Sequence, residues 1–411
     1  MALIVQKYGG TSVADAKRIK NVARRVAARH KAGDKLVVVV SAMGDTTDEL
    51  IELASQVSDH PEARELDVLL STGEMVTKTL VAMALHSLDV DAVSLTGAQA
   101  GLQTDTAHGR ARILAVEPAR IERELERGRV VIVAGFQGIS EELEVTTLGR
   151  GASDITPVAL AAALKAKQCE IYTDVDGIYS ADPRIVPDAR RLQDISYEEM
   201  LELSSLGANV LHPRAAELGM VYDIPVIVAS SFNDEPGTLI HGGVMMEQFN
   251  KVRGIASDAH VAKVTLRGVP DRPGIAAAIF EPLAEHHISV DTIVQNASVE
   301  RLTDLTFTIA SSDLKQATKI VEAAAKKVGA TEVLAEDNVG KVSIVGTGIQ
   351  SAPGYAARMF RTLSDAGINM EMISTSEIRI TCIMKATDVE KAVKALHKAF
   401  EMEKAEASEL S

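Results

Sequence analysis

Short β-branched strands alternate with helical patterns up to about Ile240, and this alternation constrains the fold more than any other feature of the sequence. Strands without polar residues are typical of a sheet that is buried on both faces. Strands of this kind that alternate with helices predict an α/β fold, in which a mostly parallel sheet is covered on each side. The expected strands are Leu3–Val5, Leu36–Val40, Ala92–Leu95, Val130–Ala134, Glu170–Thr173 and Val226–Ala229. The expected helices are Val13–His30, Thr46–Val57, Arg64–Leu85, Pro118–Arg127, Ser153–Leu164 and Ser196–Leu218.

The composition agrees with this fold and excludes some classes of partner. Hydrophobic residues make up 46% of the 411 residues, aromatic residues only 3%, and there is no tryptophan, so aliphatic side chains must fill the core. The formal net charge of −14 argues against nucleic acid or an anionic membrane as the main partner. The chain does not open on a basic segment followed by an apolar stretch, and we expect a soluble, cytoplasmic protein. Cys169 and Cys382 lie in apolar runs and are expected to be buried free thiols.

The first strand is followed by Lys7-Tyr8-Gly9-Gly10-Thr11-Ser12 and then by a helical pattern. Two adjacent glycines allow a sharp turn whose N–H groups come close to a ligand. The free N–H groups at the start of a helix favour an anion, and Lys7 adds a positive charge suited to phosphate. Ser12, with Asp15 three residues later, is the expected helix cap. The segment therefore predicts an anion site.

Three further polar clusters come where expected strands end or helices begin. Ligands of an open parallel sheet bind beyond the carboxyl ends of its strands, so these loops are expected to converge. Their hydroxyls, glycines, arginine and aspartates suit a charged small molecule and a phosphate with Mg²⁺. The sequence has no GxxxxGK[ST] motif, which excludes a P-loop. The clusters are Ser41 to Thr47, Thr147 to Asp154 and Tyr172 to Arg184.

Beyond a polar linker that begins near His241, the sequence contains an internal repeat. Ala262–Leu266 is echoed by Gly340–Ile344, and His287–Asp291 is echoed by Gly367–Glu371. The Pro-Gly pairs at Pro273 and Pro353 are 353 − 273 = 80 positions apart. Each copy has the pattern strand, Pro-Gly turn, helix, strand, strand, helix, which predicts two small α+β units packed together.

These motifs resemble aspartate kinase (aspartokinase) of the amino acid kinase family. The resemblance rests on Lys7 to Ser12, Ser71 to Glu74, Thr147 to Asp154 and Thr173 to Arg184, in this order, and the repeats look like the tandem ACT domains that follow its catalytic domain. It implies a three-layer αβα sandwich followed by two ferredoxin-like ACT domains. The expected boundaries are a catalytic domain at 1–242, a linker at 243–258, ACT domains at 259–336 and 337–404, and a tail at 405–411. The implied reaction is transfer of the ATP γ-phosphoryl group to the side-chain carboxylate of L-aspartate, the first step towards lysine, threonine and methionine.

The resemblance also assigns roles to residues. Lys7 and Asp154 are the expected catalytic residues, and aspartate is expected to be held by Thr47, Glu74, Arg150 and Ser153. Two alternatives remain: Glu74 is a buried carboxylate with a structural role, its hydrogen bonds satisfied within the protein, and Arg184 is an ordinary surface residue. The expected ATP contacts are Lys7, Gly9, Gly10, Ser41, Thr173, Asp174, Tyr179, Arg184, Asn209 and Val210, with Mg²⁺ bound to the nucleotide and no separate metal site.

The repeats are expected to bind lysine, threonine or both as inhibitors, although ACT units that only dimerise the protein are an alternative. The expected oligomer is a homo-oligomer or, if translation also starts at Met245 or Met246, an α2β2 assembly. The effector residues that the resemblance implies are Asp271, Gly274, Ile275, Ala276, Ser289, Val290, Asp291 and Gln295 in the first repeat and Tyr355, Ala356, Asn369, Met370, Ser376 and Glu377 in the second.

Two positions depart from the family pattern. Asn209 stands where the family usually has a lysine that contacts the nucleotide phosphates, so one positive charge is missing. Ala152 replaces the second glycine of a usual pair before Ser153. We therefore expect an active enzyme with a weakened grip on phosphate. Another amino acid kinase that forms an acyl phosphate, or a catalytically silent amino acid sensor, are the alternatives.

Overall fold

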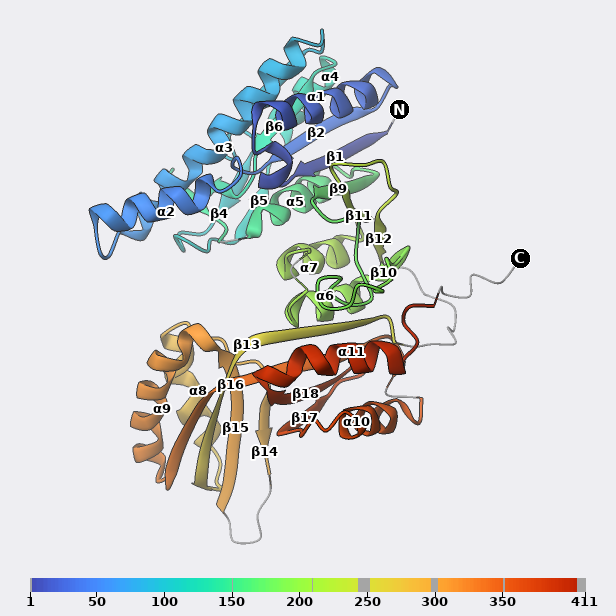
Figure 1. Ribbon diagram of the computed structural model, residues 1–411. Helices are drawn as coiled ribbons and strands as arrows, with labels where there is room; N and C mark the ends of the chain where they lie inside the picture. The colour runs from blue at the N-terminus through green and yellow to red at the C-terminus, as the bar shows by residue number, and fades with distance from the viewer. Residues whose placement is uncertain are drawn as a thin grey trace. The chain divides into compact units, whose positions relative to one another are not determined.

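The computed structural model describes residues 2–149, 151–208, 210–242, 252–296, 302–349 and 352–404. These residues form two compact units (Figure 1). The first unit comprises residues 2–178, 191–204 and 210–242, and the second comprises 179–190, 205–208 and 252–404.

The first unit is built on an eight-stranded sheet with the strand order β10-β12-β11-β9-β1-β2-β6-β3. All neighbouring strands are parallel except β11 and β12, which confirms the mostly parallel sheet. The strands are β1 (Leu3–Tyr8), β2 (Lys35–Val40), β3 (Ala92–Leu95), β6 (Val130–Ala134), β9 (Gln168–Thr173), β10 (Asp194–Ser196), β11 (Val226–Ser230) and β12 (Thr238–His241).

Helices cover both faces of this sheet, as expected for a layered α/β fold. On one face, α1 and α3 pack their apolar side chains against β1, β2 and β6 in a common core. On the other face, α5 packs on β1, β2 and β9, and α7 packs on α5 (Figure 1). Cys169 in β9 is a buried free thiol, as predicted, and so is Cys382 of the second unit. The helices are α1 (Ala16–Lys31), α2 (Thr46–Val57), α3 (Ala63–His86), α4 (Ala119–Glu126), α5 (Ile155–Ala163), α6 (Tyr197–Ser205) and α7 (Pro213–Tyr222).

Two details of the expected helices were wrong. The single helix over Ser196–Leu218 is two helices, because Gly207 has a left-handed backbone with φ of 116° and Pro213 starts a new helix. The first helix is capped by Asp15, whose side chain accepts the Arg18 N–H at 2.8 Å. Ser12 instead lies in a 3₁₀ turn, Gly10–Val13, and its hydroxyl donates to Ser231.

A second, four-stranded sheet in the first unit was not anticipated. Its order is β5-β4-β7-β8, and its strands are too short to show a clear period in the sequence. The strands are β4 (Leu102–Thr104), β5 (Ile113–Val116), β7 (Gln137–Ile139) and β8 (Val145–Thr147).

Helix α3 is the one described helix long and apolar enough to cross a membrane. However, half of its most apolar window is buried inside the protein. The buried side chains include the charged residues Asp67, Glu74 and Lys78. Helix α3 is therefore explained by its place in the core of the first unit.

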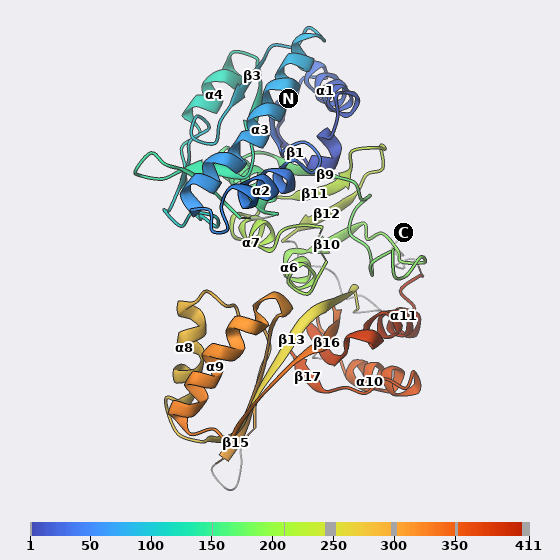
Figure 2. The same cartoon turned by 60° about the vertical axis from the view of Figure 1, so that its left-hand side comes forward.

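The second unit contains the two repeats, which confirms the internal duplication. They share one antiparallel sheet with the order β14-β15-β13-β16-β18-β17, and α8 and α9 pack on the strands of the first repeat while α10 and α11 pack on those of the second (Figure 2). The first repeat has β13 (Gly254–Pro270), α8 (Ile275–Glu285), β14 (Ile293–Gln295), β15 (Leu302–Ala310) and α9 (Leu314–Val328). The second has β16 (Glu332–Val345), α10 (Tyr355–Asp365), β17 (Met372–Thr375), β18 (Arg379–Lys385) and α11 (Val389–Ala399).

The central strands β13 and β16 cross from one repeat to the other. The first part of β13, from Gly254 to Asp258, pairs with β16 beside β18, so these residues are part of the sheet rather than of the expected linker 243–258. Residues 243–251 of that linker lie outside the described residues.

The region expected to form the catalytic domain, 1–242, is not one continuous body. Residues 179–190 belong to the second unit, where Ala181 and Val186 join the hydrophobic core of the second repeat. The Ser180 hydroxyl lies 3.0 Å from His397 Nε2 of α11, and the Ser180 carbonyl accepts the Ile255 N–H. The chain thus leaves the first unit after Ile178 and returns to it at Arg191.

Candidate functional site

Lys7 and Asp154 form an ion pair at the carboxyl end of the central strand β1. The Lys7 Nζ lies 2.7 Å from Asp154 Oδ1, and each side chain is only 9% exposed. β1 lies between β2 and β9, which fixes Lys7, and Asp154 ends the 3₁₀ turn before α5. A buried lysine paired in this way is held in one position, as a group that neutralises phosphate requires.

The glycine turn after β1 is closely packed at Gly10 but leaves room for a side chain at Gly9. A Cβ on Gly10 would lie 3.0 Å from the carbonyl oxygens of Ala42 and Gly44, and one on Gly9 would lie 3.5 Å from Lys7 Nζ. The Gly9 N–H donates to the carbonyl of Tyr172 at 3.1 Å. This N–H therefore belongs to the fold, contrary to the expectation that it holds phosphate, and Lys7 supplies the charge at the turn.

Glu74 lies beside the loop that follows β2. Its Oε1 accepts the Ala42 N–H at 3.1 Å. The two segments can approach this closely because Gly73 has no side chain: a Cβ there would lie 2.7 Å from the Ala42 Cβ. Among the described residues, Glu74 Oε2 and the neighbouring Ser41 hydroxyl are buried without a hydrogen-bond partner. Burial raises the pKa of Glu74 to about 7, against the smaller lowering effect of backbone hydrogen bonds. Buried polar groups without partners are typical of a site that a ligand completes.

The loop from Thr147 to Asp154 is anchored by Asp67, a residue that sequence reasoning missed. The fully buried Asp67 carboxylate accepts the Thr147 hydroxyl and the Gly109 N–H and also contacts the ring of His108. Beyond Thr147, Gly149 and Gly151 have φ of 103° and 73°, a backbone that favours glycine. Ala152 is fully buried and its N–H donates to Gly149, so its methyl group is accommodated within the fold.

His212 is a second residue that sequence reasoning missed. Its backbone N–H donates to Asp154 Oδ2 at 3.3 Å, and its ring Nδ1 accepts the Arg214 N–H at the start of α7. Burial lowers the pKa of His212, while the charge of Asp154 opposes that shift. The only signal in the sequence that could have identified His212 is the His-Pro pair at the start of a helix. His212 thus helps to position Asp154.

The remaining predicted nucleotide and substrate residues are divided between the units. Thr47, Ser153, Thr173, Asp174 and Val210 lie in the first unit, with Asp174 exposed and accepting the Thr173 hydroxyl at 3.1 Å. Tyr179 and Arg184 belong to the second unit, and Arg184 is 88% exposed in an ion pair with Asp182. Arg150 and Asn209 lie outside the described residues.

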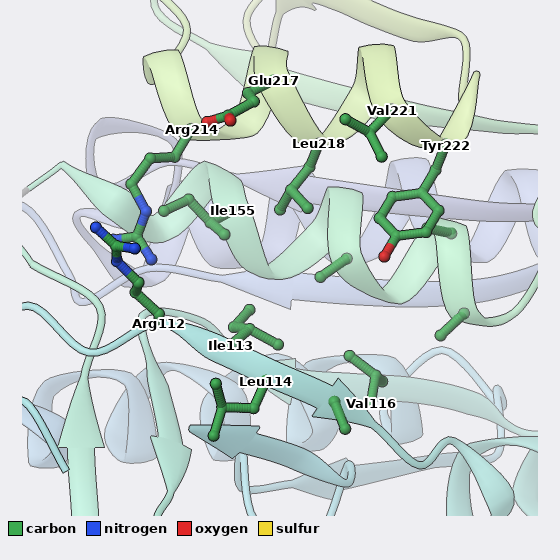
Figure 3. Close-up of a pocket in the computed structure, with 14 residues that line it drawn as sticks. Arg112, Ile113, Leu114, Val116, Ile155, Arg214, Glu217, Leu218, Val221 and Tyr222 are labelled. Atoms are coloured by element: carbon green, nitrogen blue, oxygen red, sulfur yellow. The ribbon is translucent and has the colours of Figure 1, made fainter. Parts of the chain in front are cut away.

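A groove of about 580 Å³ lies elsewhere in the first unit, between β5, α5 and α7. Figure 3 shows Arg112 and Arg214 at one end, Tyr222 at the other, and apolar side chains between them. The Arg214 guanidinium donates to the carbonyls of Leu148 and Ala111, so it ties backbone segments together. None of the described candidate residues lines this groove, which is separate from the site at the strand ends.

In the second unit, the predicted effector residues differ in accessibility. Gly274 and Gly354 precede α8 and α10 with φ of 91° and 106°, which shows that the two Pro-Gly turns are equivalent. In the first repeat Ile275 is buried and Val290 packs at the edge of the core, whereas the other predicted residues are exposed: Asp271, Gly274, Ala276, Ser289, Asp291 and Gln295. The Ile275 side chain packs in the core of that repeat, so only its backbone is left to contact an effector.

The second repeat shows the same division. Tyr355, Ala356 and Met370 pack against its core, and the Tyr355 ring stacks on Phe400 with centroids 6.0 Å apart. Asn369 and Glu377 are exposed. The Ser376 hydroxyl is buried and has no hydrogen-bond partner among the described residues.

Comparison with known proteins agrees with this architecture. The amino acid kinase family model matches residues 2–230, and ACT domain models match residues 264–326 and 342–400. An aspartokinase from Mycolicibacterium smegmatis is 51% identical over 405 residues, which is 97% of this chain and 96% of that protein. The chain belongs to the aspartokinases of the amino acid kinase family.

Solved aspartokinase structures have the same fold. Escherichia coli aspartokinase III in complex with aspartate and ADP, in its R-state, is 28% identical with a TM-score of 0.82, covering 97% of this chain and 99% of that one. The same enzyme in complex with lysine and aspartate, in its T-state, is 27% identical with a TM-score of 0.74 and the same coverage. The three-layer kinase fold followed by two ACT domains, expected from the motifs, is thereby confirmed.

Proposed function

We propose that this aspartokinase transfers the γ-phosphoryl group of ATP to the side-chain carboxylate of L-aspartate and forms 4-phospho-L-aspartate. The observation that carries the proposal is the buried Lys7–Asp154 ion pair, next to a loop that leaves Glu74 and Ser41 with unpartnered polar atoms. The Escherichia coli relative in complex with aspartate and ADP supports the same pair of substrates.

The chemistry follows from charge neutralisation and positioning. Negative charge is spread over the phosphoryl oxygens in the transition state, so a fixed cation such as Lys7 lowers the barrier without any covalent step. Asp154 holds the Lys7 ammonium in place, and the His212 N–H in turn holds Asp154. The attacking carboxylate of aspartate needs no general base, because it is already ionised at neutral pH.

Aspartate is held by groups on several loops in this proposal. The Glu74 carboxylate accepts hydrogen bonds from the α-ammonium, and Arg150 donates two parallel hydrogen bonds to the α-carboxylate. Thr47 and Ser153 add hydroxyl donors. Thr173, Asp174, Tyr179, Arg184 and Val210, with Asn209, contact the nucleotide.

Mg²⁺ enters with ATP in this proposal. The described residues contain no group of three or more His, Cys, Asp or Glu side chains that could hold a metal ion by themselves. In this proposal Mg²⁺ is held chiefly by phosphate oxygens and supplies additional charge neutralisation.

Regulation and assembly complete the proposal. The ACT repeats bind lysine, threonine or both and inhibit the reaction; the relative crystallised with lysine in its T-state supports lysine. The enzyme works in the cytoplasm as a homo-oligomer or as an α2β2 assembly that forms through its ACT domains.

ADP release tests the proposal directly. With Mg·ATP, release that depends on L-aspartate and not on L-glutamate or N-acetyl-L-glutamate is the expected result. Release with another acceptor would instead identify a different acyl-phosphate-forming kinase. A chain that binds effector but releases no ADP with any acceptor would be a silent sensor, for which the absent lysine at Asn209 would be the reason.

Asn209 provides a separate prediction. Asn209→Lys adds a positive charge near the phosphates, and we expect a lower KM for ATP or a higher kcat, by about tenfold. Steady-state kinetics with Asn209→Gln as the neutral control would measure it. Equal kinetics in both variants and the wild type would refute the weakened phosphate grip.

A further inference from the structure

Two ion pairs cross between the ACT repeats and obey the repeat symmetry. Lys341 Nζ lies 2.9 Å from Asp291 Oδ2, and Lys263 Nζ lies 2.5 Å from Glu371 Oε2. Lys263 and Lys341 are both the second residue of their copy of the repeated segment Ala262–Leu266 and Gly340–Ile344. Asp291 and Glu371 are both the last residue of their copy of His287–Asp291 and Gly367–Glu371. Each lysine therefore reaches the acidic residue of the other repeat.

The two pairs differ in one respect that bears on ligand binding. Lys263 also lies 3.2 Å from Glu336, whereas Asp291 is the one carboxylate that pairs with Lys341 among the described residues. The Lys341 side chain is 7% exposed, but that of Asp291 is 37% exposed. A buried ammonium needs its partner, while the more exposed carboxylate still has a face open to a second cation from solution.

Asp291 is also one of the residues expected to bind the effector. Its backbone N–H donates to the Thr308 carbonyl, which fixes its position two residues before β14. An amino acid effector carries an α-ammonium, and lysine carries a second ammonium on its side chain. Any such ammonium that approaches Asp291 meets a carboxylate whose charge is already balanced by Lys341.

We propose that Lys341 is an internal counter-ion of the effector site, which competes with the effector's ammonium for Asp291 and so sets the preference of the site among amino acids. This inference rests on the regulatory part of the proposed function. Lys341 weakens binding of lysine more than binding of threonine, because lysine has the additional positive charge. An effector that draws Asp291 away from Lys341 also loosens a contact between the repeats, so its binding energy differs between the paired and unpaired arrangements.

Calorimetric titration of L-lysine and L-threonine into the full-length protein, without ATP or aspartate, tests the proposal. Lys341→Met removes the charge with little change in length, and we expect it to bind lysine about fivefold more tightly, the size of one partly exposed ion pair. The affinity for threonine should rise less. Lys263→Met, at the symmetry-related position, should leave both affinities within about twofold.

Lys341→Arg distinguishes charge from packing. It keeps the positive charge, so its lysine affinity should stay at the wild-type value, and a thermal melt of each variant shows that it is folded. Unchanged or weaker lysine binding in Lys341→Met, or the same change in Lys341→Met and Lys341→Arg, would overturn the proposal. If the wild type binds neither amino acid, the effector site itself is refuted, whereas the kinase assignment is judged separately by aspartate-dependent ADP release.

Discussion

Glu74 illustrates how one residue can link burial, stability and substrate binding. A carboxylate in this position costs folding free energy when it ionises, since burial favours its neutral form. The cost is offset only when a cation arrives, and the α-ammonium of aspartate is the cation that the proposed site offers. At the residue scale the site is thus prepared for a ligand at the expense of the free protein.

Glu74→Gln should therefore raise the free energy of unfolding of the protein while it weakens the binding of aspartate. The pKa of Glu74 is raised from 4.5 to about 7, so the wild type loses stability as the pH rises from 4.5 through about 7, by up to about 3 kcal/mol. Glu74→Gln has no carboxyl group to ionise and should not lose this stability. Its free energy of unfolding should therefore exceed that of the wild type only slightly below pH 4.5 and most above pH 7. Urea denaturation across this range measures it, and the KM for aspartate should rise. A constant difference at all pH values would contradict the account.

Lys7→Met should nearly abolish catalysis. We expect kcat to fall by about 10²–10³, because the charge proposed to neutralise the phosphoryl group is lost. The unfolding free energy should fall by about 3 kcal/mol, since Asp154 would be left buried without its cation. Lys7→Arg, which keeps the charge, is the matched control and should retain more activity. Equal kcat in Lys7→Met and wild type would remove Lys7 from the mechanism.

At the scale of elements, the site depends on how helix α3 and the loops after the strands are joined. Asp67 and Glu74 lie two turns apart on α3 and fix two loops, Asp67 through Thr147 and Glu74 through Ala42. The helix therefore sets the distance between the loop after β2 and the loop that precedes Asp154.

Asp67→Ala should disturb the second of these loops. It leaves the Thr147 hydroxyl and the Gly109 N–H without their acceptor in a buried place, at a cost of about 3 kcal/mol. The KM for aspartate should rise, because the loop that carries the proposed aspartate-binding residue Ser153 loses this anchor. Asp67→Asn, which keeps an acceptor oxygen, should be milder in both thermal melting and kinetics. A normal KM in Asp67→Ala would show that the loop is held by other contacts.

The same contacts show what the sequence could and could not predict. Strand ends and glycine turns gave the places of Lys7 and Asp154, because each depends on local pattern and on a parallel sheet. The partners of Asp67 are 41 to 80 residues away, and the break between α6 and α7 depends on a glycine inside an otherwise helical pattern. Contacts of this kind are set by tertiary packing, which a single sequence does not display.

At the scale of the whole molecule, the chain passes from the first unit to the second and back again. Residues 179–190 carry the predicted nucleotide contacts Tyr179 and Arg184 but pack in the core of the second repeat. Ser180, Ala181 and Val186 of this segment are buried, so we expect a rearrangement of that core to move the segment. We therefore expect the state of the ACT repeats to affect the proposed nucleotide contacts Tyr179 and Arg184 along this route.

A chain that ends at residue 242 should show this dependence. It lacks His397 and the core around Val186, so residues 179–190 lose their packing. We expect its KM for ATP to rise about tenfold or more, equivalent to roughly 1.4 kcal/mol, even without effector. Steady-state kinetics beside the full chain measures this change. An unaltered KM for ATP in the truncated chain would contradict the proposed route.

The most direct measurement of the central claim is a crystal structure of the protein soaked with Mg·ADP and L-aspartate. The account predicts that both ligands lie beyond the carboxyl ends of β1, β2 and β9, with Lys7 Nζ facing the nucleotide phosphates and Glu74 bonded to the α-ammonium of aspartate. Ligands bound elsewhere, for example in the groove between Arg112 and Tyr222, with the Lys7–Asp154 pair remote from both, would contradict it.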